Sequence, residues 1–455
     1  MVATLASFLT PFMGSAANVA LPAIGKEFVL DAVTLSWVAT IYLLSAAVFL
    51  VPCGKLADIH GRRRIFLQGL CVYSAASLLC AIAPGAVFLL AGRAAQGLGG
   101  GMIFGTSIAL LTSIFPPSRR GEALGVNVAA VYLGLSVGPV LGGVLTEQLG
   151  WRSVFFLSAG LGSVTALVAA RGLRGEWVEA AHERLDVAGA ALYGAGLAML
   201  MCGLGLLPER TGAVLTGSGI VLLTGFVAWE RRARHPLLDM RLFLENRVFA
   251  LSNLAALVNY AATFAIGFLL SLHLQSVEGL TAQATGALLV AQPLVMTAVS
   301  PLAGRLSDRI DSRLVASWGM GTIVVGLALL AFVGRGTPHA YLVGCLVLLG
   351  AGFGLFSSPN TNAVMASVEQ RAYGVAAATL ATMRLVGQML SMGLAGLALG
   401  LVVGRGSTVA ARPEAFIAAM RLTFALFSVM CVFGTLASLA RGRTATAAGP
   451  QARSA

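Results

Sequence analysis

Charge is scarce in this chain of 455 residues. Only 11% of the residues are charged and 58% are hydrophobic, whereas a soluble domain carries about 25% charged residues. This composition argues against a soluble protein and for a chain that crosses a lipid bilayer several times. The net charge of +12 does not indicate nucleic-acid binding, because the sequence has no basic face with interleaved aromatic residues.

Patterned cysteine and histidine are also lacking. The six cysteines form no C-x-x-C pair and lie in or beside apolar runs, where we expect them to act as small core residues. The five histidines are scattered, and no nucleophile triad or phosphate-binding glycine loop occurs at a usable spacing. We therefore expect no metal site, no cofactor and no catalytic residue, and the chain is not expected to be an enzyme.

No basic segment precedes the first apolar run, Val2 to Ile24, so we expect a membrane helix there and not a cleaved signal peptide. A bilayer-spanning helix needs about 20 mainly apolar residues, and about fourteen such runs follow one another. The predicted fold class is therefore an all-α polytopic membrane protein. The runs cover residues 3–24, 34–54, 64–83, 86–114, 122–146, 152–170, 187–207, 212–229, 248–273, 283–304, 314–334, 340–364, 374–402 and 416–440.

The basic residues are distributed unevenly between the two sides of these predicted helices. If the N-terminus lies in the cytoplasm, most Lys and Arg residues fall in cytoplasmic loops, including those in residues 62–64 and 231–234. This is the asymmetry of the positive-inside rule. It predicts that both termini are cytoplasmic.

A charged strip occurs twice in the chain. GKLADIHGRR from Gly54 and GRLSDRIDSR from Gly304 align without a gap. An even number of predicted helices separates the copies, so both lie on the same side of the membrane, as in a parallel duplication. We expect two six-helix bundles plus two inserted linking helices. The predicted division is 1–170 for the first bundle, 171–247 for linkers and inserted helices, 248–440 for the second bundle, and 441–455 for a cytoplasmic tail.

The strip resembles the loop between helices 2 and 3 of the major facilitator superfamily, and the whole chain resembles its fourteen-helix drug:proton antiporter branch. It departs from the family pattern at Ile59, where Arg is usual, and at Asp311, where the second copy should have Gly. The resemblance implies the major facilitator fold and a cytoplasmic latch whose aspartate pairs with basic residues in one conformation only. Alternatively, the arginines of the strip only fix the topology. The implied latch residues are Gly54, Asp58, Gly61, Arg62, Arg63, Gly304, Asp308 and Arg309.

The segment LLAGRAAQGLGGG places Arg93 and Gln96 within the fourth predicted helix and matches the family pattern R-x-x-Q-G. Arg93 is about nine residues into the helix, roughly 13 Å deep. A buried intramembrane arginine is costly and indicates function. We expect it to bind substrate or to adjust a proton carrier, unless it snorkels to the interface.

The segment GLSVGPVLGG in the fifth predicted helix matches the antiporter signature of the family. Gly134, Gly138 and Gly142 recur every four residues and form a flat face for close helix packing. Pro139 removes one backbone hydrogen bond and can kink the helix, and Gly143 completes the motif. Generic helix packing is the alternative interpretation.

Polar residues in other predicted helices are further candidates. Arg384 and Gln388 lie four residues apart and therefore share a face of the thirteenth helix, where we expect a role in transport or coupling. Each of the cavity candidates could instead simply bridge two helices. These candidates are Asn18, Asn253, Tyr260, Gln292 and Asn362.

The first helix lacks the carboxylate that the drug-exporting branch usually has just before its NVALP element, because Met13 occupies that position. Glu122 and Asp58, both near the inner ends of helices, are the remaining candidates to carry a proton. A cavity without a central carboxylate favours neutral or anionic substrates over dications.

The resemblance implies a secondary active transporter that exports small amphipathic or drug-like compounds by alternating access. A proton gradient, and no cofactor, would supply the energy. The alternatives are a dedicated exporter of a neutral or anionic metabolite or natural product, and a non-transporting receptor. We expect a monomer in the cell inner or plasma membrane, with substrate, protons and lipid as partners and an accessory export protein as a further option.

Overall fold

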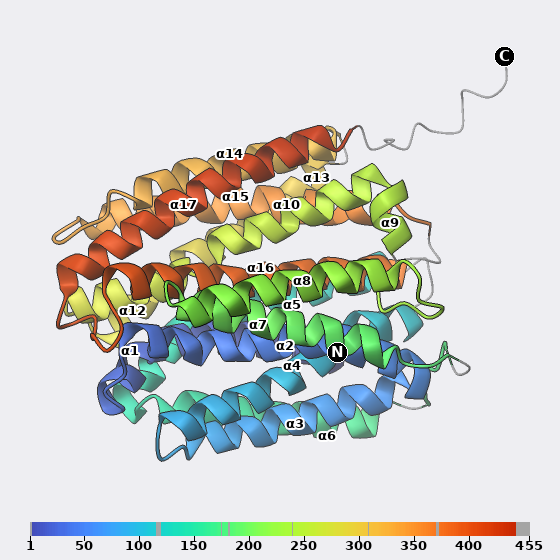
Figure 1. Ribbon diagram of the computed structural model, residues 1–455, viewed down its shortest axis with the longest axis horizontal. Coiled ribbons are helices and arrows are strands. Elements are labelled where there is room, and N and C mark those ends of the chain that lie inside the picture. Colours follow the sequence, from blue (N-terminus) through green and yellow to red (C-terminus); the bar gives the residue numbers. More distant parts are fainter. Residues whose placement is uncertain are drawn as a thin grey trace.

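The computed structural model describes residues 2–114, 120–173, 175–180, 183–238, 240–307, 309–369 and 373–442, with side chains throughout except in residues 2, 3, 112 and 120–125. All regular structure in this described part is helical. Figure 1 shows the helices running side by side along the long axis of the molecule.

Fourteen spans among the described residues are long and apolar enough to cross a membrane, which confirms the predicted number. One span, Arg247–Val277, combines α10, α11 and η2, and another, Ala282–Ser307, combines α12 and α13. The helices are α1 (Val2–Glu27), α2 (Ala32–His60), α3 (Arg62–Ala81), α4 (Ala86–Ile114), α5 (Arg120–Leu149), α6 (Arg152–Gly172), α7 (Val187–Leu206), α8 (Arg210–Glu230), α9 (Met240–Glu245), α10 (Arg247–Thr263), α11 (Ile266–Leu272), η2 (His273–Val277), α12 (Ala282–Leu289), α13 (Ala291–Ser307), α14 (Ser312–Leu330), α15 (His339–Ala366), α16 (Tyr373–Val402) and α17 (Pro413–Ala440).

The long helices form two groups that can be followed by colour in Figure 1. In the first group, α1–α6, helix α1 packs against α5, and α4 packs against both α2 and α3. In the second group, α10–α17, helix α15 packs against α13 and α14, and α10 packs against α16 and α17. The groups meet along two seams, α2 with α16 and α5 with α12 and α13.

The strip Gly54–Arg64 is not the loop that its charge predicts. Helix α2 continues to His60 and α3 begins at Arg62, so Gly61 is the one residue between them. Gly61 has φ +113°, a backbone conformation that glycine adopts without strain, and its N–H donates to Ala57 O at 2.9 Å. The prediction of a loop was wrong because a single glycine is enough to reverse the chain here.

The inserted helices α7 and α8 form an antiparallel pair beside the α2–α16 seam (Figure 1). They approach closely because Gly219 faces the backbone of Leu200, where an added Cβ would lie 2.5 Å from the Leu200 nitrogen. Helix α7 also packs against both α2 and α16. This pair therefore touches both helix groups.

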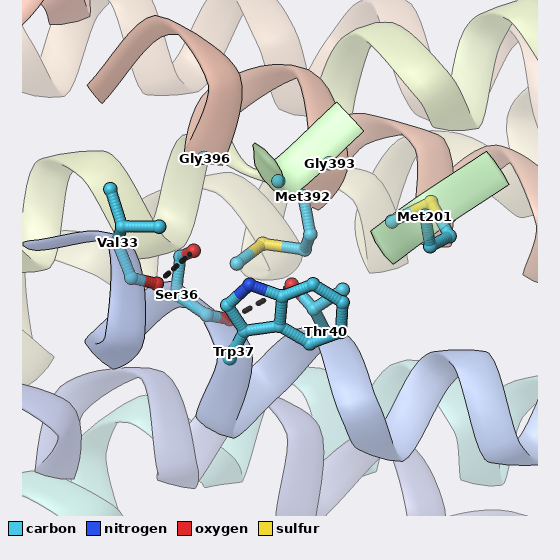
Figure 2. A pocket seen from close by; sticks show the side chains of 9 residues that line it. Val33, Ser36, Trp37, Thr40, Met201, Met392, Gly393 and Gly396 are labelled. Atoms are coloured by element: carbon cyan, nitrogen blue, oxygen red, sulfur yellow. Dashed lines mark hydrogen bonds between the residues drawn. The ribbon is translucent and has the colours of Figure 1, made fainter. Parts of the chain in front are cut away.

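Figure 2 shows the point where these three helices meet. Ser36, Trp37 and Thr40 of α2 lie opposite Met392 of α16, with Met201 of α7 beside them. The space left between them is only about 10 Å³, which is about the room needed for one water molecule. The seam is therefore filled at this position.

Candidate functional site

The end of the bundle that carries Gly54–Arg64 is here called the strip end, and the opposite end the far end. At the far end the two helix groups are joined by hydrogen bonds. The Gln283 N–H of α12 donates to Glu147 Oε2 of α5 at 3.0 Å. Gln275 Nε2 of η2 donates to Val19 O of α1, also at 3.0 Å. The far end is thus closed by polar contacts between the groups.

At the strip end a cavity of about 650 Å³ lies between α2 and α4 of the first group and α16 of the second. Residues 176–179 and 236–238, which lie outside the long helices, form part of its wall. This volume is within the usual range for small-molecule sites. Its described polar lining includes Lys55, Asp58, Arg62, Ser113, Glu179 and Thr382.

Arg62 is the centre of a polar network beside this cavity. Its side chain is only 6% exposed, and its Nε donates to Asp58 Oδ1 at 2.8 Å. Its two terminal nitrogens donate to the two carboxylate oxygens of Glu179, each at 2.6 Å. It also donates to Ser113 Oγ of α4. A buried guanidinium is stable here because two carboxylates neutralise it and several acceptors satisfy its N–H groups.

Glu179 belongs to a segment that lies along the strip. This segment, residues 175–180 together with Glu183, is called the strap. Glu176 accepts the Arg63 N–H at 2.8 Å. Glu183 forms an ion pair with Lys55, and this hydrogen bond from Lys55 holds the pKa of the Glu183 carboxyl below its ordinary value. Three acidic residues of the strap thus each contact a different residue of the strip.

Backbone contacts hold the strap in the same place. The Arg62 N–H donates to Trp177 O at 3.0 Å, and the N–H groups of Glu179 and Ala180 donate to Asp58 O at 3.1 and 3.0 Å. The sequence interpretation missed the strap entirely. The available signal was the presence of three Glu residues in a linker that was otherwise predicted to be a basic inner loop.

The second copy of the strip is built differently. Gly304 lies in α13, where an added Cβ would be 3.1 Å from Ser358 Oγ. Arg309 is exposed in the turn after α13, and its N–H donates to Leu306 O at 3.1 Å. Asp308 lies outside the described residues. The latch role predicted for this copy stays a prediction.

The buried arginine of the second group comes from the end of α17. Arg441 is 1% exposed and donates to Ser252 Oγ at 3.2 Å, Asn360 Oδ1 at 2.9 Å and Ser312 O at 2.8 Å. Burial lowers the pKa of Arg441 to about 10. It joins the strip-end termini of α10, α14, α15 and α17, and nothing in the sequence repeat pointed to it.

Arg93 does not reach the cavity lining. It is 2% exposed within the first helix group, and it donates to Val38 O at 2.9 Å and to Gln96 Oε1 at 2.5 Å. Its guanidinium lies 4.5 Å from the ring centre of Tyr42, and Gln96 Nε2 donates to Ser77 Oγ at 2.7 Å. The side chain therefore turns inward and does not snorkel. The transport role predicted for Arg93 and Gln96 stays a prediction.

Arg384 of α16 has a different setting. Its Nη2 donates to Thr361 Oγ1 of α15 at 2.6 Å, and its guanidinium lies 5.7 Å from the ring centre of Tyr260. Tyr260 in turn packs edge-on against Phe353, with 5.2 Å between ring centres. Gln388 is half-buried one turn further along α16. Arg384 thus connects three helices of the second group.

The glycine motif of α5 packs against α1. An added Cβ at Gly134 would lie 2.6 Å from Phe8 O, and one at Gly142 would lie 2.7 Å from the Ala16 Cα. Gly138 faces α1 in the same way. The flat face expected from the spacing is therefore present, and it allows the two backbones to approach closely.

The end of the same motif faces the other helix group. An added Cβ at Gly143 would lie 2.5 Å from Ala282 O of α12, and Gly286 of α12 packs directly on Pro139 O. Helix α5 runs through Pro139 without interruption. One motif therefore packs α5 within its own group and also across the far-end seam.

The predicted cavity residues are dispersed. Asn18 lies at the contact between the two groups, where its Nδ2 would be 3.6 Å from a Cβ added to Gly267. Asn253 is fully buried and donates to its own helix, and Asn362 is exposed and donates to Ser307 Oγ at 3.2 Å.

Two further candidates remain. Gln292 is half-buried in α13, and like Asn18, Asn253, Tyr260 and Asn362 it is not among the described residues that line the 650 Å³ cavity. Glu122 falls in the first turn of α5, but its side chain lies outside the described residues.

Met13, which replaces the expected carboxylate, is buried and its Sδ accepts a hydrogen bond from Ser158 Oγ at 3.0 Å. It is an ordinary core contact between α1 and α6.

The family model of the Major Facilitator Superfamily matches residues 3–391 and, in a second match, residues 252–454. The chain belongs to the Major Facilitator Superfamily. Membership makes it a multi-pass membrane transporter of small molecules and not an enzyme, as the sequence predicts. The second match begins early in α10, at the start of the second helix group.

Curated relatives within the superfamily carry the names of exporters and transporters. The chain is 34% identical to the cephamycin export protein CmcT of Amycolatopsis lactamdurans, over 90% of this chain and 85% of that one. It is 31% identical to the multidrug resistance protein Stp of Mycobacterium tuberculosis, over 83% and 71%. It is 29% identical to the riboflavin transporter RibZ of Clostridioides difficile, over 83% and 82%. The relatives fit a drug or metabolite exporter.

Proposed function

We propose that this transporter exports small amphipathic compounds in exchange for protons, with the strip end facing the cytoplasm. The observation that supports this is the 650 Å³ cavity between the two helix groups at the strip end, while hydrogen bonds close the far end. In alternating access, such an arrangement receives substrate on one side before release on the other. We propose the two groups, residues 1–170 and 248–440, as the moving halves.

The cavity favours substrates without net charge. Most of its charged lining residues are already engaged in ion pairs, Arg62 with Asp58 and Glu179 and Lys55 with Glu183, and Glu176 accepts the Arg63 N–H. A charged substrate would have to compete with these ion pairs, whereas an uncharged amphipathic one could use the hydroxyl of Thr382 and the apolar part of the wall. The names of CmcT and Stp are consistent with antibiotic-like compounds.

We propose that the latch of the first half acts through Arg62. Asp58 pairs with Arg62, and the strap holds Arg62 from the other side. Rearrangement of the strip end would therefore require the strap and the strip to separate or to move together. The two halves would not be equivalent, since Arg441 takes the buried position in the second half.

The distribution of arginine bears on the location of the protein in the membrane. The excess of Arg near the strip end favours a cytoplasmic strip end and cytoplasmic termini in the inner or plasma membrane. We propose a monomer that needs no cofactor, with an accessory export protein as an optional partner.

The test is transport in vesicles that contain the purified protein under an imposed pH gradient. A panel of cationic, neutral and anionic compounds would be supplied on the strip-end side. We expect gradient-driven flux for neutral amphipathic compounds above the charged ones. Absence of gradient-dependent flux for every compound would overturn proton-driven export. Flux restricted to one compound would favour the dedicated metabolite exporter.

A further inference from the structure

The loop between α16 and α17, residues 403–412, crosses the α2–α16 seam at the far end. The Gly406 N–H donates to Asp31 Oδ2 at 3.0 Å, and Ser407 O accepts the Ala32 N–H at 3.2 Å. Asp31 is the N-cap of α2, and its other oxygen accepts the Thr34 N–H at 3.1 Å. This loop of the second helix group is thus bonded to the first residues of α2, in the first group.

The same loop is bonded to the inserted helices. Arg405 forms an ion pair with Glu209, in the turn between α7 and α8, and donates a further hydrogen bond to Gly205 O of α7. Behind it, Arg412 Nη1 donates to Val403 O at 3.2 Å, so the two ends of the loop are tied together. We call the bonds from residues 405–407 to α2 and to the inserted pair the clasp.

The inserted pair is itself fastened to the first group. Tyr193 OH of α7 donates to Ala47 O of α2 at 3.2 Å. Nearer the far end, a Cβ added to Gly205 would lie 3.0 Å from the Trp37 ring of α2. The strap, which precedes α7 in the chain, is held by backbone hydrogen bonds to the strip of the same group. Among the described residues, Arg405 supplies the hydrogen bonds that join the second group to the pair.

Helices α2 and α16 approach each other at the far end and diverge at the strip end. Near the far end, a Cβ added to Gly396 would lie 2.9 Å from Ser36 Oγ, in the filled junction of Figure 2. Towards the strip end the same two helices line the 650 Å³ cavity, for example with Gly54 and Thr382. The clasp therefore lies at the narrow end of the seam, where opening of the far end would separate α2 from α16.

We propose that the inserted pair acts as a brace of the first half, and that its turn at Glu209, together with Asp31, holds the loop of the second half and keeps the far end closed. Separation of the halves at this end would break the bonds to Asp31, Ala32, Gly205 and Glu209 together. Each bond is weak, because an exposed ion pair contributes little. The clasp can therefore be released in every transport cycle. This inference rests on the movement of the two halves that we propose above.

The clasp favours the state whose cavity is open at the strip end. A ligand that binds one state of a protein has an apparent affinity that falls with the fraction of protein in that state. Loosening the clasp should therefore weaken substrate binding from the strip end, although none of its residues lines the cavity. The two inserted helices thus acquire a role in the transport cycle.

The test measures the width of the far end directly. Spin labels at Val87→Cys of α4 and Leu401→Cys of α16, exposed positions in the two groups, would report it after the six native cysteines have been replaced. We expect Glu209→Gln to raise the ratio of open to closed far end about two- to fivefold, as for loss of an exposed ion pair. Asp31→Asn keeps an N-cap acceptor for α2 but loses the second carboxylate oxygen, so it should shift the ratio in the same direction.

Glu414→Gln is the matched control, because it disrupts an exposed ion pair with Arg335 at the same end but within the second group. It should leave the ratio unchanged. Charge reversal supplies a rescue: Glu209→Arg should open the far end further, and addition of Arg405→Glu should restore closure.

An unchanged ratio in Glu209→Gln, an equal shift in Glu414→Gln, or a failure of Arg405→Glu to reverse the effect of Glu209→Arg would overturn the proposal. Because Glu209 is exposed, these variants are expected to fold. Gradient-driven flux in vesicles is a separate measurement: its absence would overturn the proton exchange, whereas the shifts in far-end width would still support the clasp.

Discussion

At the residue scale, Arg62 shows how a buried charge is kept stable at the strip end. Its side chain is nearly inaccessible, yet one partner, Glu179, is 63% exposed. The desolvation of Arg62 is therefore offset by a carboxylate that water still reaches. Removal of that carboxylate leaves Arg62 with Asp58 as its remaining anionic partner.

This predicts the effect of Glu179→Gln. The neutral amide keeps an acceptor but loses the charge, so we expect stability to fall by about 1 kcal/mol, discounted for the exposure of Glu179. Thermal denaturation of the purified protein would show a lower midpoint. Glu414→Gln, which disrupts the exposed pair with Arg335 at the far end, should have almost no effect. Equal shifts in both variants would contradict the special role of the strap.

The Lys55–Glu183 pair makes the stability of the folded protein depend on pH. Because Lys55 lowers the pKa of Glu183 in the folded protein, the pair stabilises the fold above the ordinary glutamate pKa, and this contribution is lost as pH falls through the lowered value. We expect the parent protein to melt at a higher temperature than Glu183→Gln at pH 7. The difference should shrink towards zero below about pH 4. A constant difference across this range would contradict the assignment.

At the element scale, the glycine face of α5 was predictable because its signal is local. Residues four apart share a helix face, so the spacing of Gly134, Gly138 and Gly142 was enough to predict close packing. The partner helix was not predictable, since nothing in α5 identifies α1. The strap was missed for the same reason: Glu176, Glu179 and Glu183 lie in a non-helical linker, and their partners are more than a hundred residues away.

Gly134→Ala tests this packing. The added methyl group would lie 2.6 Å from Phe8 O, a backbone atom that cannot rotate away. We expect a loss of about 1–3 kcal/mol from overpacking, seen as a lower midpoint of thermal unfolding. Gly160→Ala in α6 is the control, because nothing lies within 4 Å of its added Cβ. Its stability should stay the same or rise slightly.

At the scale of the whole molecule, the number of spans could be predicted from the sequence, whereas the sidedness of the strip stays a prediction. The bilayer requires long apolar runs in its spanning helices, and cytoplasmic loops are enriched in Lys and Arg. Both features can be recognised directly in the sequence. The cavity was not predictable, because its walls come from helices far apart in the chain and from the strap. The predicted polar residues such as Asn253 instead satisfy neighbouring backbone groups.

Chemical labelling can test the predicted sidedness and the closed far end together. Ala378→Cys is exposed in the cavity wall, and Gln148→Cys is exposed at the far end. In inside-out vesicles, a membrane-impermeant maleimide should label the first position from outside and not the second, with the reverse pattern in whole cells. The six native cysteines would be replaced beforehand. The opposite pattern would place the strip end outside the cell.

The inserted helices also affect how a compound dissolved in the membrane can enter. Helix α7 covers the α2–α16 seam, and the junction with Trp37, Met201 and Met392 leaves room for about one water molecule. The other seam, between α5 and the second group, has no such cover from α7 or α8. The α2–α16 seam and the α5 seam therefore present different barriers to a compound that enters from the bilayer. A hydrophobic substrate that partitions into the bilayer would meet the inserted helix pair on one flank and the α5 seam directly on the other, so the two lipid-facing sides of the transporter are not equivalent.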